Sequence, residues 1–176
     1  MKWIRRGTDE SGLTLVEVLA ALVILSVVSL VLTSFFTNAL TYAKGNQSKT
    51  VMVNLARNAL FYMEKQSYEP IHTYFANTTN TAITCPVSGC DANVSQLAED
   101  SSILQQILNP NINNVQYTIS VIYQRDMHND MLNNSDTKNM AEELLPVLVR
   151  VEKVNGTASA RNAAEVEGYI ASERVR

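Results

Sequence analysis

The chain has 176 residues, a net charge of −3, 46% hydrophobic residues and only two cysteines. This length allows one membrane segment and one modest soluble domain, but not two such domains. No basic block is present, which argues against a dedicated surface for nucleic acid.

The N-terminal region combines a short basic leader with a long apolar run. Lys2, Arg5 and Arg6 precede the run, partly offset by neighbouring acidic residues, and no charged residue occurs from Val18 to Ala43. The run exceeds the ~20 residues that span hydrocarbon, and also the 7–15 residues or so of a cleavable secretory signal. The excess of Lys and Arg before it predicts a single-pass protein of the cytoplasmic membrane, with the N-terminus cytoplasmic and the C-terminal domain outside.

Glu17 lies near the start of this apolar segment. An unpaired carboxylate in hydrocarbon is costly, so the charge requires a partner or access to the headgroup level. Side chains near helix ends can reach the interface. The residue alone leaves both alternatives open.

The helical pattern continues beyond the apolar run. Neither Pro nor Gly occurs from Leu13 to Lys44, and the first proline is Pro70. We therefore predict one helix from Leu13 to about Gln66, loosened near Gly45 because glycine costs roughly 1 kcal/mol in a helix interior. Its second half, residues 44–67, is predicted to be amphipathic. Its apolar stripe consists of Met52, Leu55, Ala56, Ala59, Leu60 and Met63.

Residues 67–114 are rich in Asn, Thr and Ser and are predicted to form a connecting loop, with one helical piece from Val94 to Leu108. Cys85 and Cys90 flank turn-forming residues in TCPVSGC. An even pair in an extracytoplasmic domain favours a disulfide. A metal site is the alternative, but the further ligands of a closed zinc site are missing.

Three later segments are predicted to be strands. VQYTISVIY (Val115 to Tyr123) alternates like a half-buried strand. PVLVRVEKV (Pro146 to Val154) is rich in β-branched residues, with its proline at the strand start. EVEGYIAS (Glu165 to Ser172) is a third, weaker strand. The predicted fold class is α+β, a long N-terminal helix packed on a small antiparallel sheet.

The remaining polar residues do not indicate a catalytic or metal site. Asp126, Asp130 and Asp136 lie in RDMHNDMLNNSD, but His128 and Met131 break the pattern of an EF-hand loop. This segment is predicted to be a solvated loop. His72 is predicted to be a packed loop residue rather than a catalyst. No motif for a nucleophile, a phosphate loop or a zinc protease is present, so no enzymatic activity and no cofactor or metal are predicted.

The segment GLTLVE (Gly12 to Glu17), which follows the leader and opens an apolar helix, resembles the processing signal of type IV prepilins and type II secretion pseudopilins. The resemblance implies that a prepilin peptidase cleaves between Gly12 and Leu13 and methylates the new amine. Leu13 replaces the usual phenylalanine with an apolar residue of similar size, which is compatible with cleavage. The resemblance covers about the first 30 residues.

The resemblance also implies a partner for Glu17. In a filament, the carboxylate of Glu17 would pair with the positively charged amine of Leu13 in a neighbouring subunit. Such a pair stabilises only when both charges are present, because removal of one leaves the other unpaired. Glu17 and Leu13 are therefore the predicted assembly residues, and Gly12 and Leu13 the predicted processing residues.

These features predict a filament subunit, a minor pilin or pseudopilin of a type IV pilus, a competence pilus or a type II secretion filament. The predicted partners are other pilin subunits, the prepilin peptidase, the inner-membrane assembly platform with its ATPase, and membrane lipid before assembly. EVLAALVILSVV most resembles minor subunits. The alternative is a signal-anchored membrane protein that binds a ligand or partner outside and never polymerises. The acidic chain argues against direct DNA binding.

The corresponding division of the chain has four parts. We predict a leader at 1–12, a transmembrane and assembly half of the helix at 13–43, an amphipathic half at 44–67, and an extracytoplasmic loop and sheet domain at 68–176. Subunits that contact one another head to tail, without closing into a ring, would form a helical filament.

Overall fold

The computed structural model describes residues 14–154 and 162–176. The chain divides into two units, Met1–Lys44 and Gly45–Arg176. One helix, α1 (Leu15–Glu64), contributes to both units. Neither Gly45 nor its neighbours interrupt α1, so the predicted long helix is confirmed to within two residues of its expected ends.

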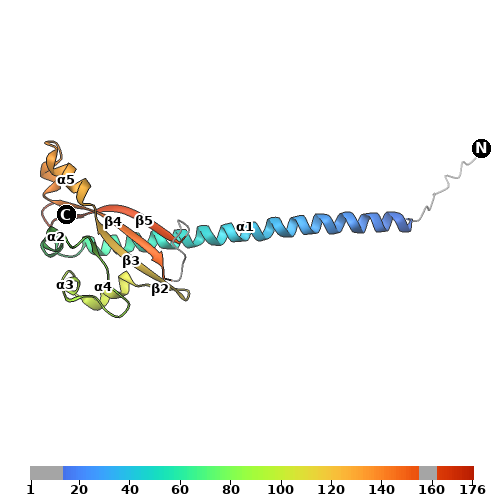
Figure 1. The fold of residues 1–176 in the computed structure, drawn as a ribbon, viewed down its shortest axis with the longest axis horizontal. Helices are drawn as coiled ribbons and strands as arrows, with labels where there is room; N and C mark the ends of the chain where they lie inside the picture. The colour runs from blue at the N-terminus through green and yellow to red at the C-terminus, as the bar shows by residue number, and fades with distance from the viewer. Residues whose placement is uncertain (1–13, 155–161) are drawn as a thin grey trace, which may run out of the picture. The chain divides into compact units, whose positions relative to one another are not determined.

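The second unit contains the sheet and the part of α1 that packs on it (Figure 1). Within α1, Met52, Ala56, Ala59 and Met63 are fully buried. These residues recur at helical spacing on one face, and all four belong to the predicted apolar stripe. The fold class is therefore α+β as predicted, with a long apolar N-terminal helix packed on a small antiparallel sheet.

The described strands form one five-stranded antiparallel arrangement. Its central path runs β1–β3–β4–β5, and β2 pairs with β3. The bounds are β1 Ala82–Ile83, β2 Asn111–Ile112, β3 Val115–Tyr123, β4 Leu144–Lys153 and β5 Ala163–Ala171.

Strand β3 has the bounds that the alternating pattern predicted. Tyr117, Ile119 and Val121 point into the core. Alternate residues of β3 face the other side because successive side chains of a strand point to opposite faces. The turn before β3 is formed by Asn113 and Asn114, both with positive φ, which asparagine tolerates better than most residues and which two-residue hairpins require.

The prediction that Pro146 starts a strand is wrong. β4 begins at Leu144 and Pro146 is its third residue. The Pro146 carbonyl accepts a hydrogen bond from the Gln124 backbone N–H, just beyond the end of β3. In an antiparallel strand the N–H and C=O of a residue point to the same side. The backbone N–H that Pro146 lacks would therefore have pointed at Gln124, which lies beyond the end of β3. A proline inside β4 therefore removes no bond from the β3–β4 ladder.

The connecting region is more ordered than the single helical piece predicted for it. It contains α2 (Tyr68–Ala76), α3 (Ala92–Ser95) and α4 (Ser101–Leu108). Pro70 lies in the first turn of α2, where backbone N–H groups have no intrahelical partner and proline is tolerated. The predicted helix from Val94 is interrupted before α4, because the Asp100 side chain accepts backbone N–H bonds from the first residues of α4 and starts a new helix there.

The polar segment after β3 is helical instead of the predicted solvated loop. It forms α5 (Arg125–Asn133) and α6 (Lys138–Ala141). The buried residue of α5 is His128. Its ring hydrogen-bonds the hydroxyl of Tyr123 through Nδ1, and its Nε2 lies 2.7 Å from the carbonyl oxygen of Ala141. This one side chain thus joins the end of β3 to both helices.

The C-terminal residues fold back onto the start of α2. The backbone N–H of Tyr68 donates to the Glu173 carboxylate over 2.9 Å, and this bond lowers the pKa of Glu173. Burial and the neighbouring Glu143 carboxylate raise the pKa of Tyr68 to about 12. Arg176 donates to the Gln66 carbonyl just beyond α1. The residues that follow β5 therefore connect it, through hydrogen bonds, to the segment between α1 and α2.

Candidate functional site

The candidate assembly site is the first turn of α1, where Thr14 and Glu17 form a capping box. The backbone N–H of Thr14 donates to Glu17 Oε2 over 2.8 Å, and the Thr14 hydroxyl donates to the same oxygen over 2.9 Å. In return, the backbone N–H of Glu17 lies 3.3 Å from Thr14 Oγ1. The T-x-x-E spacing is a helix-start signature, which could have been found in the sequence and was missed.

The capping box uses only one of the two carboxylate oxygens. Glu17 Oε2 accepts both bonds from Thr14, and Oε1 has no hydrogen-bond partner among the described residues. A carboxylate offers about four lone-pair positions. The geometry therefore fixes the direction of the side chain and leaves Oε1 able to accept from an external cation.

The other two predicted assembly and processing residues, Gly12 and Leu13, lie outside the described residues. The described chain begins one residue later, at Thr14, and α1 begins at Leu15. Their roles remain predictions.

The first unit exposes apolar side chains on every side of α1. Leu15 is 80% exposed, and Leu30 and Phe35 are each 72% exposed. Among the described residues α1 is the one helix long and apolar enough to cross a membrane, judged by its length and composition. A surface of this kind is stable only in lipid or against other apolar surfaces, which fits a single-pass membrane protein.

Four hydroxyl groups within this apolar part of α1 donate to backbone carbonyls of the helix itself. The side chains of Ser26 and Thr33 donate to carbonyls four residues earlier, over 2.7 and 2.8 Å. Thr37 and Thr41 make similar bonds. Unsatisfied polar groups are costly in hydrocarbon, so these internal bonds make these four hydroxyls compatible with lipid.

The comparison with protein families is consistent with this site. A model described as the prokaryotic N-terminal methylation motif matches residues 8–33, which include the Gly12–Leu13 junction, the capping box and the first half of the apolar helix. The match supports the type IV pilin-like family and indicates a substrate of the prepilin peptidase type, which implies assembly with other pilins. It points to a structural subunit. No curated protein and no solved structure matches the chain.

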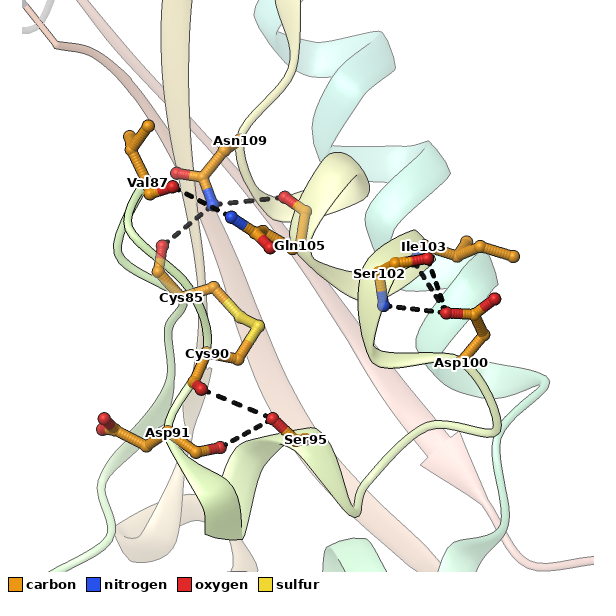
Figure 2. Close-up of a disulfide and its surroundings, with 10 residues drawn as sticks. All are labelled: Cys85, Val87, Cys90, Asp91, Ser95, Asp100, Ser102, Ile103, Gln105 and Asn109. Carbon is orange, nitrogen blue, oxygen red and sulfur yellow. Dashed lines mark hydrogen bonds between the residues drawn. A yellow bond between two sulfur atoms is a disulfide. The ribbon is translucent and has the colours of Figure 1, made fainter.

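In the second unit, the structure joins Cys85 and Cys90 through their sulfur atoms (Figure 2). Their Cα atoms lie 4.4 Å apart. The Cys85 carbonyl accepts a hydrogen bond from the side chain of Asn109, and the Cys90 carbonyl accepts one from Ser95. The pair therefore connects β1, α3 and the end of α4. Its oxidation in the exported protein remains a prediction.

The other residues considered as ligands or catalysts are dispersed. Asp126 and Asp130 are on α5, and Asp136 lies in the turn before α6. No group of three or more His, Cys, Asp or Glu side chains that could hold a metal was found in the described chain. His72 is exposed on α2 and stacks on Tyr68, so the prediction of a packed loop residue is wrong.

Proposed function

We propose that this protein is a filament subunit, a minor pilin or pseudopilin of a type IV pilus, a competence pilus or a type II secretion filament. A prepilin peptidase removes residues 1–12 and methylates the amine of Leu13. The inner-membrane assembly platform and its ATPase then move residues 13–43 from the bilayer into the filament. Residues 44–67 and 68–176 form the domain outside the cytoplasmic membrane.

The observation that carries this proposal is the position of Glu17. It lies within the residues that match the methylation motif, in the first turn of an exposed apolar helix. Cleavage after Gly12 would create a positive amine at Leu13, four residues before the carboxylate. In a filament, the amine of one subunit and Glu17 of the next would neutralise each other in a region that excludes water.

The capping box supports this pairing because it orients the carboxylate in advance. Thr14 holds Glu17 Oε2 through two hydrogen bonds, so the side chain loses little freedom when Oε1 accepts a bond from an amine. Thr14 is on this view a positioning residue.

The capping box is also the observation that favours the second candidate function. Glu17 already satisfies two donors at the start of α1, which is a sufficient structural role in a membrane anchor that never polymerises. In that case the outer domain would bind a ligand or partner by itself, and the charge of Glu17 would be dispensable.

Two substitutions of Glu17 separate these functions. Glu17→Gln keeps a side chain that can complete a capping box but removes the charge, whereas Glu17→Ala removes both. If the charge pairs with an amine, we expect both variants to be recovered in sheared filaments at about one tenth of the wild-type level or less. Wild-type recovery of Glu17→Gln together with loss of Glu17→Ala would show that only the cap matters, and the filament pairing would be wrong.

Two controls accompany this experiment. Thr14→Val removes the hydroxyl of the capping box and keeps the charge, so its recovery should fall less than that of Glu17→Gln. Intact-mass analysis of membrane-extracted protein should show a chain that begins at Leu13 with one added methyl group in every variant. A wild-type chain that retains Met1 in cells with the peptidase would contradict the proposed processing.

A further inference from the structure

A groove on the second unit has a lining that differs from the apolar core beside it. Its volume is about 550 Å³, within the range of about 300–1,000 Å³ that small-molecule sites occupy. One wall is α2 with the residues after it, and the other is α3 with the residue pair that follows it. The lining residues are Glu69, Pro70, Thr73, Tyr74, Asn77, Asn80, Asn93, Gln96 and Leu97.

Several of the polar groups in the groove are held in place by the protein. The Asn80 amide nitrogen donates to the Tyr74 carbonyl over 2.9 Å, and the Tyr74 hydroxyl donates to the Ala82 carbonyl over 3.2 Å. Asn77 Oδ1 accepts two bonds from Thr79. These hydrogen bonds therefore orient the side chains of Tyr74, Asn77 and Asn80 without a ligand.

Other polar groups of the lining are exposed to solvent. The side chains of Thr73, Asn93 and Gln96 make no hydrogen bond to any other described residue. Asn93 and Gln96 follow the disulfide-linked Cys90 by only a few residues, and the disulfide joins this wall to Cys85, just after β1. The groove thus presents exposed amides and a hydroxyl that have no hydrogen-bond partner within residues 14–154 and 162–176.

The chemistry of this lining selects a class of ligand. Side-chain amides and hydroxyls each offer both donors and acceptors, which match the hydroxyl groups of a sugar. No Lys, Arg or His is among the described residues that line the groove, so their chemistry does not favour an anion. Glu69 is the single carboxylate, too few charged oxygens for a Ca²⁺ site.

The lining also argues against a peptide ligand. Strand addition requires an open sheet edge, and helix docking requires an apolar groove. Here both walls come from helices and most lining side chains are polar. Tyr74, Pro70 and Leu97 supply apolar surface of the kind that packs against the face of a sugar ring.

We propose that the groove between α2 and α3 binds a neutral oligosaccharide. Asn93, Gln96 and Thr73 would hydrogen-bond its hydroxyl groups, and Tyr74 would contact a ring. This inference is independent of the filament function proposed above, since it concerns only the second unit and holds for a polymerising or a non-polymerising protein.

The test uses the full chain in micelles of a detergent without a sugar headgroup. N,N′,N″-Triacetylchitotriose, maltotriose and cellotriose are added separately at about 10 mM, near saturation for a site with a Kd of ~1 mM. Binding is detected by saturation-transfer NMR and quantified by calorimetry. We expect at least one of the three neutral trisaccharides to bind, and binding by none would overturn the proposal.

Matched double variants locate the site. Asn93→Ala with Gln96→Ala should weaken binding about ten-fold, as expected for two lost hydrogen bonds. Gln106→Ala with Asn139→Ala makes the same chemical change at exposed positions outside the groove and should bind like wild type. Equal affinity in both double variants would overturn the proposal, provided that circular dichroism shows both to be folded.

Competing probes distinguish the class of ligand. An uncharged seven-residue peptide and a sulfated disaccharide are tested under the same conditions, and we expect neither to displace the neutral trisaccharide. Thr73→Trp, which fills the groove from the exposed side of α2, should abolish trisaccharide binding. Binding of the peptide or the anion at the groove in place of the neutral sugars would show that the assigned chemistry is wrong.

Discussion

Gly168 provides a quantitative test of how α1 packs on the sheet. It lies in β5 opposite Val147 of β4, and a Cβ atom added to it would lie 2.4 Å from Leu60 Cδ2, 3.1 Å from Cδ1 and 3.3 Å from Cγ. Carbon atoms in contact are about 3.5–4.0 Å apart. Gly168→Ala therefore requires the whole Leu60 side chain to move, and not only one methyl group.

Two opposing effects set the size of the change. Overpacking in a well-packed core costs about 1–3 kcal/mol, whereas replacing glycine by alanine stabilises by about 0.4–1 kcal/mol through the unfolded chain. Leu60 is only partly buried and part of its side chain can shift, so Gly168→Ala should lower the free energy of unfolding by up to about 2 kcal/mol. In a Leu60→Ala background the clash is absent, and the same substitution should be neutral or stabilising.

The assay is urea unfolding of the full chain in micelles, followed by circular dichroism, for the two single variants and the double variant. The cycle should give a coupling energy of about 2 kcal/mol between positions 60 and 168. Gly45→Ala is the matched control, because nothing lies within 4 Å of a Cβ there and alanine should stabilise the helix by up to about 1 kcal/mol. An equal effect of Gly168→Ala with and without Leu60 would refute the packing described here.

Two further predictions concern the second unit. Replacing Cys85 and Cys90 by serine should lower the free energy of unfolding by about 2 kcal/mol, the value expected for closing so short a loop. Wild-type protein should lose the same amount on reduction, and exported wild-type protein should show no free thiol by alkylation and mass spectrometry. Glu173→Gln should destabilise the protein near neutral pH. The difference in free energy of unfolding between wild type and this variant should disappear in acid. The Tyr68 N–H lowers the pKa of Glu173 in the folded state, and this stabilisation is lost as the pH falls through that lowered pKa. If wild type remains more stable than Glu173→Gln at low pH, the Glu173 carboxylate is not the source of the difference.

Local patterns in the sequence determined α1 and β3, the two elements in which apolar residues recur at one regular spacing. The apolar stripe of α1 and the alternation in β3 each report which face is buried, since helical and strand side chains repeat every 3.6 and 2 residues. The T-x-x-E box at Thr14 and Glu17 was equally local and could have been recognised. The methylation motif is likewise a property of contiguous residues.

The tertiary structure alone decided the features that depend on partners distant in the chain. Pro146 fits inside β4 because β3 happens to end opposite it. The polar segment of α5 is helical around His128, whose two ring nitrogens find partners on β3 and at the end of α6. The groove between α2 and α3 assembles side chains from separate helices. No local pattern specifies these contacts, because their energy comes from burial and hydrogen bonds that exist only once the chain has folded.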